Sequence, residues 1–244
     1  MIVIALAVIA VPVVVLGGEI EVARHGTDVP TPDVATLALT IPPGLTRVLW
    51  LGDSTAAGVG ASDVDGALST QVARRLPAAG GADVSVIAVS GARIADMIRD
   101  QLPRVHKFTP DVVVISVGAN DTVHLTRARR FRDAYTHVID GLRAQGVAAA
   151  HVVMVGVPDM GAPRRLLQPL RAITGLRARR LDREVRRVAG ATHAHYVDLF
   201  RATSKPFRAH PSKYFARDKY HPSDAGYALW ADAIAPAVAA AVAN

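Results

Sequence analysis

Short runs of consecutive apolar residues, separated by helical patterns, constrain the fold of this chain more than any other feature. The clearest run is Val112–Val117, which is β-branched at every position except Ser116. Similar runs occupy Arg47–Leu51, Val84–Val89, Val152–Val155 and a shorter stretch, His195–Val197. Strands that are apolar on both faces are typical of a parallel sheet covered by helices on both sides.

Helical periodicity fills the intervals between these runs. The pattern is strongest over Arg127–Ala144, where one apolar stripe contains, at helical spacing, Phe131, Tyr135, Val138 and Leu142. Further helices are expected over Ser69–Ala79, Arg93–Gln101, Leu166–Val188 and Ser223–Val242. The last of these is rich in alanine, and we expect it to pack against the sheet. Alternating strands and helices predict a three-layer α/β/α fold around a doubly wound parallel sheet.

The N-terminal part of the chain differs in composition from the rest. Residues 1–16 carry no charged or polar side chain, and residues 19–44 contain four prolines and no long periodic pattern. We expect residues 1–18 to be an export signal or a membrane anchor, residues 19–44 to be a linker, and residues 45–244 to form the catalytic domain. The predicted localisation is the cell envelope or the exterior. A buried N-terminal helix or strand is the alternative for the apolar segment.

Composition excludes some kinds of site and favours some partners. Cysteine is absent, so disulfides, thiolate metal sites and a cysteine nucleophile are excluded. The net charge of +7 favours anionic surroundings such as lipid head groups or cell-wall polymers. We interpret the arginines from Arg164 to Arg187 as a solvated helix face, with contact to an anionic membrane or cell wall as the alternative. This stretch lacks interleaved aromatic residues, which disfavours nucleic acid as a partner.

The sequence contains a serine, a histidine and an aspartate that could together form a site with a serine nucleophile. Ser54 follows the first apolar run, and Asp218 and His221 lie three positions apart near the C-terminus. A serine hydroxyl attacks effectively when an imidazole takes its proton, and a carboxylate orients that imidazole. The three residues therefore predict a catalytic triad of Ser54, His221 and Asp218.

Residues that can stabilise an oxyanion follow the next two apolar runs. Gly91 comes after the second run and Asn120 after the third. Because ligands bind at the carboxyl edge of an open parallel sheet, both residues are placed where a site would form. We expect the backbone N–H groups of Ser54 and Gly91 and the side-chain amide of Asn120 to be the donors. An ordinary turn is the alternative for Gly91 and a loop cap for Asn120, whereas we expect Asp121 to be structural.

These residues lie in blocks that resemble those of the SGNH (GDSL-type) hydrolases. Leu51–Ser54 is similar to the first block and Gly91 to the glycine of the second. Gly118–Asp121 resembles the third block and Asp218–His221 the last, in family order. Thr55 departs from the leucine of the namesake motif, at a position that does no chemistry in the family. The resemblance implies a flavodoxin-like strand order.

The resemblance also implies a bacterial serine esterase or lipase-like enzyme. Such an enzyme hydrolyses carboxylic esters through an acyl-enzyme intermediate, without a cofactor or a metal. We expect a small-molecule or lipid ester with a short or medium acyl chain. The alternatives are acyl or acetyl transfer, removal of O-acetyl groups from cell-wall carbohydrate, and lysophospholipase or thioesterase activity. A non-catalytic module that binds cell-wall polymer is the remaining alternative.

Overall fold

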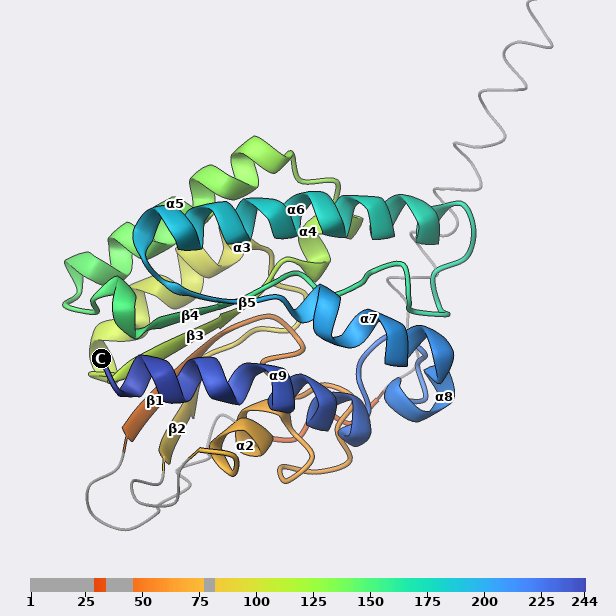
Figure 1. Ribbon diagram of the computed structural model, residues 1–244, viewed down its shortest axis with the longest axis horizontal. Coiled ribbons are helices and arrows are strands. Elements are labelled where there is room, and N and C mark those ends of the chain that lie inside the picture. Colours follow the sequence, from red (N-terminus) through yellow and green to blue (C-terminus); the bar gives the residue numbers. More distant parts are fainter. Residues whose placement is uncertain (1–28, 34–45, 77–81) are drawn as a thin grey trace, which may run out of the picture.

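The computed structural model of this protein describes residues 29–33, 46–76 and 82–244. Within these residues, a five-stranded parallel sheet has the order β2-β1-β3-β4-β5 (Figure 1). The strands are β1 (Thr46–Gly52), β2 (Ala82–Val86), β3 (Val112–Ser116), β4 (Val152–Val155) and β5 (His195–Val197). This order is the flavodoxin-like arrangement. It confirms the predicted strands and the strand order that the resemblance implied.

Helices cover both faces of the sheet, so the three predicted layers are confirmed. In Figure 1 the upper face carries α3 (Ile94–Asp96), α5 (Ala128–Ala144) and α6 (Leu170–Thr192). The lower face carries α2 (Leu68–Ala73), α7 (Leu199–Ala209) and α9 (Asp224–Val242). The short helices α4 (Ala119–Val123) and α8 (Pro211–Tyr214) lie toward the carboxyl ends of the strands. A π-helical turn, Met97–Gln101, and two 3-10 segments, Leu102–Lys107 and Ala149–His151, complete the described elements.

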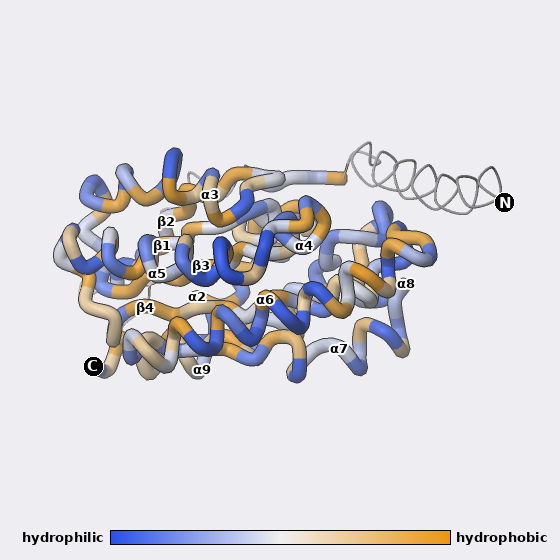
Figure 2. Tube along the Cα trace, turned by 90° about the horizontal axis from the view of Figure 1, so that it is seen from above, coloured by the Kyte–Doolittle hydropathy of each residue, from blue (hydrophilic) through white to orange (hydrophobic). Residues whose placement is uncertain are grey.

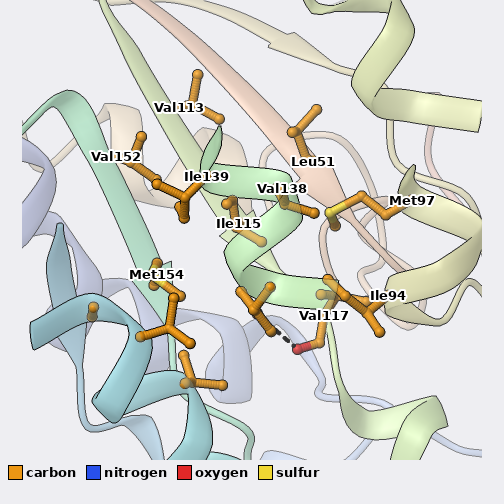
Figure 3. Close-up of a cluster of buried hydrophobic side chains, with 14 of the residues drawn as sticks. Leu51, Ile94, Met97, Val113, Ile115, Val117, Val138, Ile139, Val152 and Met154 are labelled. Carbon is orange, nitrogen blue, oxygen red and sulfur yellow. Dashed lines mark hydrogen bonds between the residues drawn. The ribbon is translucent and has the colours of Figure 1, made fainter. Parts of the chain in front are cut away.

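Alternating side chains of each central strand form the two halves of the core. In β1, Val48 and Trp50 pack in the cluster shared with α2 and α9, whereas Leu49 and Leu51 pack in the opposite cluster. Figure 3 shows part of this second cluster, in which side chains of β1, β3, β4 and α5 meet. Full burial of one large aliphatic side chain contributes about 1.5–3 kcal/mol. The central strands, anchored on both faces, therefore form a rigid support for residues at their carboxyl ends.

Two helix predictions are confirmed in detail. Helix α5 begins one residue after the predicted start, and its predicted stripe is buried. Helix α9 begins after Ser223, whose hydroxyl accepts a hydrogen bond from the Gly226 N–H at 3.3 Å. By length and composition α9 is the one described helix that could cross a membrane. Its side chains at Tyr227, Trp230 and Ile234 are nevertheless buried in the core, as expected for a helix that packs against the sheet.

Other boundaries differ from the predicted ranges. Helix α6 starts and ends four residues later than predicted, because Leu166 is buried from a loop and the helix continues until His193 adopts a left-handed conformation. Strand β2 starts two residues before the predicted Val84 and ends at Val86. Helix α2 ends at Ala73, well before the predicted end, and residues 77–79 of that range lie outside the described residues.

The predicted signal or anchor, residues 1–18, lies outside the described residues, as does most of the predicted linker. Within the linker, residues 29–33 form no helix or strand. The Pro30 carbonyl accepts a hydrogen bond from the Gly60 N–H at 2.9 Å, so this short piece lies against the loop that follows β1.

Candidate active site

A chain of hydrogen bonds joins the three predicted triad residues. The Ser54 Oγ lies 3.0 Å from the His221 Nε2, although the two residues are 167 positions apart. The other ring nitrogen of His221, Nδ1, lies 2.6 Å from the Asp218 Oδ2. With the ring proton on Nδ1, the imidazole donates to the carboxylate and accepts from the serine hydroxyl. The structure therefore brings these residues together in the arrangement that activates a serine.

The carboxylate of Asp218 is fixed by its own turn. Its Oδ1 accepts hydrogen bonds from the backbone N–H groups of Tyr220 and His221, both at 3.0 Å. Burial alone would raise the pKa of Asp218, but the hydrogen bond from the His221 ring and those from the two amides outweigh burial. The pKa of Asp218 is consequently held below its usual value. An ionised carboxylate thus orients the imidazole.

The turn after β1 holds Ser54 at the carboxyl edge of the sheet. The Asp53 N–H donates to the Ser116 carbonyl of β3 at 3.1 Å. The Asp53 carboxylate accepts from the Thr55 N–H at 2.9 Å and from the Thr55 hydroxyl at 2.8 Å. Burial raises the pKa of Asp53 to about 6, against the opposing effect of these two hydrogen bonds. Thr55, at the position where the motif departs from the family, therefore helps to hold the nucleophile turn.

Gln101 is a second support of this turn that the sequence did not reveal. Its side chain accepts from the Gly52 N–H at 2.9 Å and donates to the Gly52 carbonyl at 2.8 Å. Gln101 is fully buried and lies at the end of the π-helical turn. It therefore supplies the acceptor for the N–H of the residue at which β1 ends, two positions before Ser54, and a second donor to its carbonyl, which also accepts from the Val89 N–H at 3.1 Å.

The predicted oxyanion donors lie at the same edge of the sheet. In the described part of the chain, no protein acceptor takes the backbone N–H of Ser54 or that of Gly91. Gly91 is exposed, and nothing lies within 4 Å of the position that a side chain would occupy. One N–H of the Asn120 amide donates to the Ala92 carbonyl at 3.1 Å, which ties Asn120 to the Gly91 loop. Its second amide N–H remains available to a substrate.

Helix α4 presents Asn120 because Gly118 precedes it. Gly118 has a φ of 131°, and a side chain there would meet Val157 at 2.8 Å and Phe131 at 3.1 Å. Only glycine combines this backbone conformation with such close packing. Asp121 is structural, as predicted, since its carboxylate accepts from the Ile94 N–H of α3 at 3.0 Å. Burial raises the pKa of Asp121.

A narrow pocket of about 30 Å³ opens beside the triad. Ser54, His221 and Asn120 line it, together with side chains that are mostly apolar, namely Met160, Ala162, Phe207, Phe215 and Trp230. Gly91 is not part of its lining. Asp159 also lines the pocket and forms an ion pair with Arg208 at 2.6 Å. Asp159 was not among the predicted site residues, since nothing in the motif spacing marks this loop.

A parallel α/β sheet with a Ser–His–Asp chain at its carboxyl edge is the architecture of a serine hydrolase. Residues 50–229 match the model of the GDSL-like lipase/acylhydrolase family. The chain belongs to this family, which confirms the resemblance seen in the motifs.

Individual relatives are similar to this chain in sequence or in fold. A GDSL-like esterase of Mycobacterium tuberculosis is 33% identical over 191 residues, which are 76% of this chain and 59% of that protein. A lipase/acylhydrolase from Enterococcus faecalis has 25% identity and a TM-score of 0.59, over 79% of this chain and 94% of that one. An acetyl xylan esterase variant from Geobacillus stearothermophilus, at 19% identity, has a TM-score of 0.62 with coverages of 79% and 94%. The chain thus spans 59% of the length of the curated relative.

Proposed function

We propose that this protein is a serine esterase that hydrolyses carboxylic esters through an acyl-enzyme intermediate. The observation that carries the proposal is the 3.0 Å contact between the Ser54 Oγ and the His221 Nε2, continued by the 2.6 Å contact to Asp218. His221 takes the serine proton while Oγ bonds to the ester carbonyl carbon. The imidazolium then protonates the departing alkoxide as the carbon–oxygen bond breaks.

Hydrolysis of the acyl-enzyme repeats the same proton transfers. His221 takes a proton from water as the water oxygen bonds to the acyl carbon, and it returns a proton to Ser54 as the acid leaves. Each step passes through a tetrahedral oxyanion. The donors proposed for it are the N–H groups of Ser54 and Gly91 and the amide of Asn120. A fixed donor of this kind is worth about 2.7–4 kcal/mol in acyl-transfer sites.

The dimensions of the pocket beside the triad favour a short acyl group. A volume of about 30 Å³ exceeds the roughly 10–15 Å³ that one water needs, but it accommodates only a few heavy atoms. Its apolar lining suits a methyl or ethyl group. We therefore propose acetyl and propionyl esters as the preferred substrates. Lysophospholipase or long-chain thioesterase activity is disfavoured, because a long acyl chain needs a larger groove.

Two alternatives remain: an acetyl transferase, which differs from an esterase in the molecule that accepts the acyl group, and a cell-wall-binding module, which has no catalytic activity. An acetyl transferase would use the same triad but would pass the acyl group to an alcohol in preference to water. A non-catalytic cell-wall module has no use for a buried aspartate, imidazole and serine joined by hydrogen bonds. We therefore favour the esterase, with O-acetylated cell-wall carbohydrate as a natural substrate class.

A series of p-nitrophenyl esters tests the proposal directly. The protein should hydrolyse the acetate and propionate fastest, with kcat/KM falling from butyrate onward. An added alcohol should leave the rate of nitrophenol release unchanged in an esterase and raise it in a transferase. Full activity of the Ser54→Ala variant, with folding verified by circular dichroism, would contradict the mechanism.

We also propose that the protein is exported. The support is the apolar segment of residues 1–16 that precedes the folded domain. Cell fractionation followed by N-terminal sequencing tests this proposal. Recovery in the envelope or the medium supports it, whereas recovery in the cytoplasm contradicts it.

A further inference from the structure

Basic side chains line a second cavity next to the narrow pocket beside the triad, which we name the acyl pocket. This cavity, of about 510 Å³, lies between the loop before α6, the first turns of α6, and α7. Four arginines line it, namely Arg164, Arg171, Arg179 and Arg208. Ala162 lines both this cavity and the acyl pocket, so the two share a wall. We name it the arginine cavity. Figure 2 shows hydrophilic colour on much of α6.

A third cavity continues this basic region and also adjoins the acyl pocket. It has a volume of about 450 Å³ and is lined by Arg164, Arg217 and Lys219 among others. Arg164 belongs to both basic cavities, and Phe215 lines both this one and the acyl pocket. We name it the loop cavity. The two cavities therefore form one cationic region around the triad, since Arg217 and Lys219 flank Asp218.

Most of these cations have no carboxylate partner in the described part of the chain. Arg208 pairs with Asp159, but among the described residues no carboxylate lies within ion-pair distance of Arg164, Arg171 or Arg217. Unpaired guanidinium groups that line a cavity are suited to a carboxylate or a phosphate, which they bind through paired N–H donors.

The walls of the two cavities are attached to the triad. The Arg165 N–H donates to the Lys219 carbonyl at 3.2 Å, which ties the loop before α6 to the loop that carries Asp218 and His221. Gly161 and Gly175 pack so closely that a side chain on Gly175 would lie 3.0 Å from the Gly161 Cα. The backbone that carries Arg164 and Lys219 is therefore held in a defined position relative to the reacting serine.

We propose that the arginine cavity and the loop cavity bind the anionic group of an O-acylated saccharide whose ester enters the acyl pocket. The group is a carboxylate, as in a uronic acid, or a phosphate on the sugar. This proposal rests on the proposed esterase function and names its substrate class. The shared walls explain how one molecule can place an acetyl group beside Ser54 and an anion beside Arg164.

The shape of the region favours a saccharide over a bilayer surface. The cations line cavities of about 510 and 450 Å³, and each cavity shares a lining residue with the acyl pocket. A flat lipid surface would instead contact cations on an outward-facing patch. Leu176, which is 72% exposed, also lines the arginine cavity and offers an apolar contact to the carbon face of a sugar ring.

The experiment compares matched acetyl esters. Acetylated glucose is the neutral substrate, acetylated glucuronic acid carries a carboxylate, and acetylated glucose phosphate carries a phosphate. Acetate release gives kcat/KM for each at low and at high salt. We expect one or both anionic esters to exceed the neutral one by about tenfold at low salt, with the ratio falling as salt is added. The two anionic arms distinguish carboxylate from phosphate.

Substitutions of single arginines test whether the preference for anionic substrates arises in the two cavities. Arg164→Ala, Arg171→Ala and the double variant should each lower the anionic-to-neutral ratio, and the double variant should bring it close to one. Arg180→Ala is the matched control, because Arg180 is an exposed arginine of α6 that lines neither cavity. It should keep the ratio of the wild type. An equal loss in Arg180→Ala would indicate a diffuse field and would overturn the assignment to the cavities.

Further measurements distinguish a failure of this inference from a failure of the proposed esterase function. Titration of the Ser54→Ala variant with glucuronate or glucose phosphate should show binding that Arg164→Ala abolishes, independently of catalysis. Turnover of p-nitrophenyl acetate without any anionic preference would overturn this inference and leave the proposed esterase intact. Arginine-dependent binding to phosphatidylglycerol vesicles in the absence of an anionic-sugar preference would likewise overturn it, in favour of a lipid surface. Absence of turnover on every ester would overturn the proposed function.

Discussion

The side chain of Gln101 hydrogen-bonds to both backbone groups of Gly52, at 2.9 Å and 2.8 Å, across 49 positions of sequence. Gly52 ends β1, and the nucleophile turn begins immediately after it. One buried amide therefore links the geometry of the π-helical turn to the position of Ser54.

Replacement of Gln101 by leucine should destabilise the protein and impair catalysis. The buried Gly52 N–H loses its acceptor, a loss that costs about 1–3 kcal/mol, whereas the Gly52 carbonyl keeps the hydrogen bond from the Val89 N–H at 3.1 Å. The urea midpoint should fall, and kcat on p-nitrophenyl acetate should fall more than KM rises, because Ser54 loses its support. Gln101→Glu keeps the acceptor for the Gly52 N–H and should recover part of the stability. An unchanged midpoint in Gln101→Leu would contradict the assigned role.

Replacement of Asp218 by asparagine should preserve the fold but remove most of the activity. The asparagine carbonyl can still accept from the Tyr220 and His221 amides, while its NH₂ group faces the His221 Nδ1. The imidazole then carries its proton on Nε2, where it cannot accept from Ser54. A comparable change in a known triad lowers kcat about 10⁴-fold. Steady-state kinetics and circular dichroism check the result, and activity close to that of the wild type would refute the orienting role.

Replacement of Asn120 by alanine tests the oxyanion donors. Loss of one fixed donor should lower kcat by about 10²–10³-fold with a smaller effect on KM. The variant also loses the bond to the Ala92 carbonyl, so the thermal midpoint should be measured alongside. A stable variant with unaltered kcat would remove Asn120 from the proposed oxyanion hole.

The stability of the protein should depend on the protonation of Asp182 in α6. Burial raises the pKa of Asp182 to about 6, against the hydrogen bond from the Tyr196 hydroxyl. The folded state thus holds this proton more tightly than the unfolded chain, whose carboxyl has a pKa of about 4. The resulting stabilisation is complete below pH ~4 and is lost as the pH rises through ~6.

The Asp182→Asn variant isolates this effect because its side chain stays neutral. Urea unfolding of both proteins at several values between pH 4 and pH 7 should show the wild type losing stability relative to the variant as the pH rises. Parallel curves would show that Asp182 titrates at the same pH in both states.

Much of the fold could be predicted because the responsible patterns are local. The β-branched run at Val112–Val117 and the apolar stripe of α5 each indicate an element without knowledge of its neighbours. Helix α6 shows where local patterns fail: buried Leu166 continues the helical spacing into a loop, and only the left-handed backbone of His193 ends the helix.

The three triad residues could be predicted from their spacing and their order in the chain. The residues that support the triad could not. The role of Gln101 depends on a π-helical turn that brings it against β1. The Asp159–Arg208 pair joins a loop to α7, a helix that was not predicted from the sequence. Such contacts arise from packing between distant segments, and no periodicity marks them. The oxyanion roles of Gly91 and Asn120 stay predictions.

Covalent labelling with a fluorophosphonate tests the central claim most directly. The reagent phosphonylates a serine only when a neighbouring base and oxyanion donors activate it. Peptide mapping of the labelled protein should place a single adduct on Ser54. The adduct should be absent in Ser54→Ala and strongly reduced in His221→Ala. An adduct on another residue, or ester hydrolysis that persists at full rate without Ser54, would contradict the account.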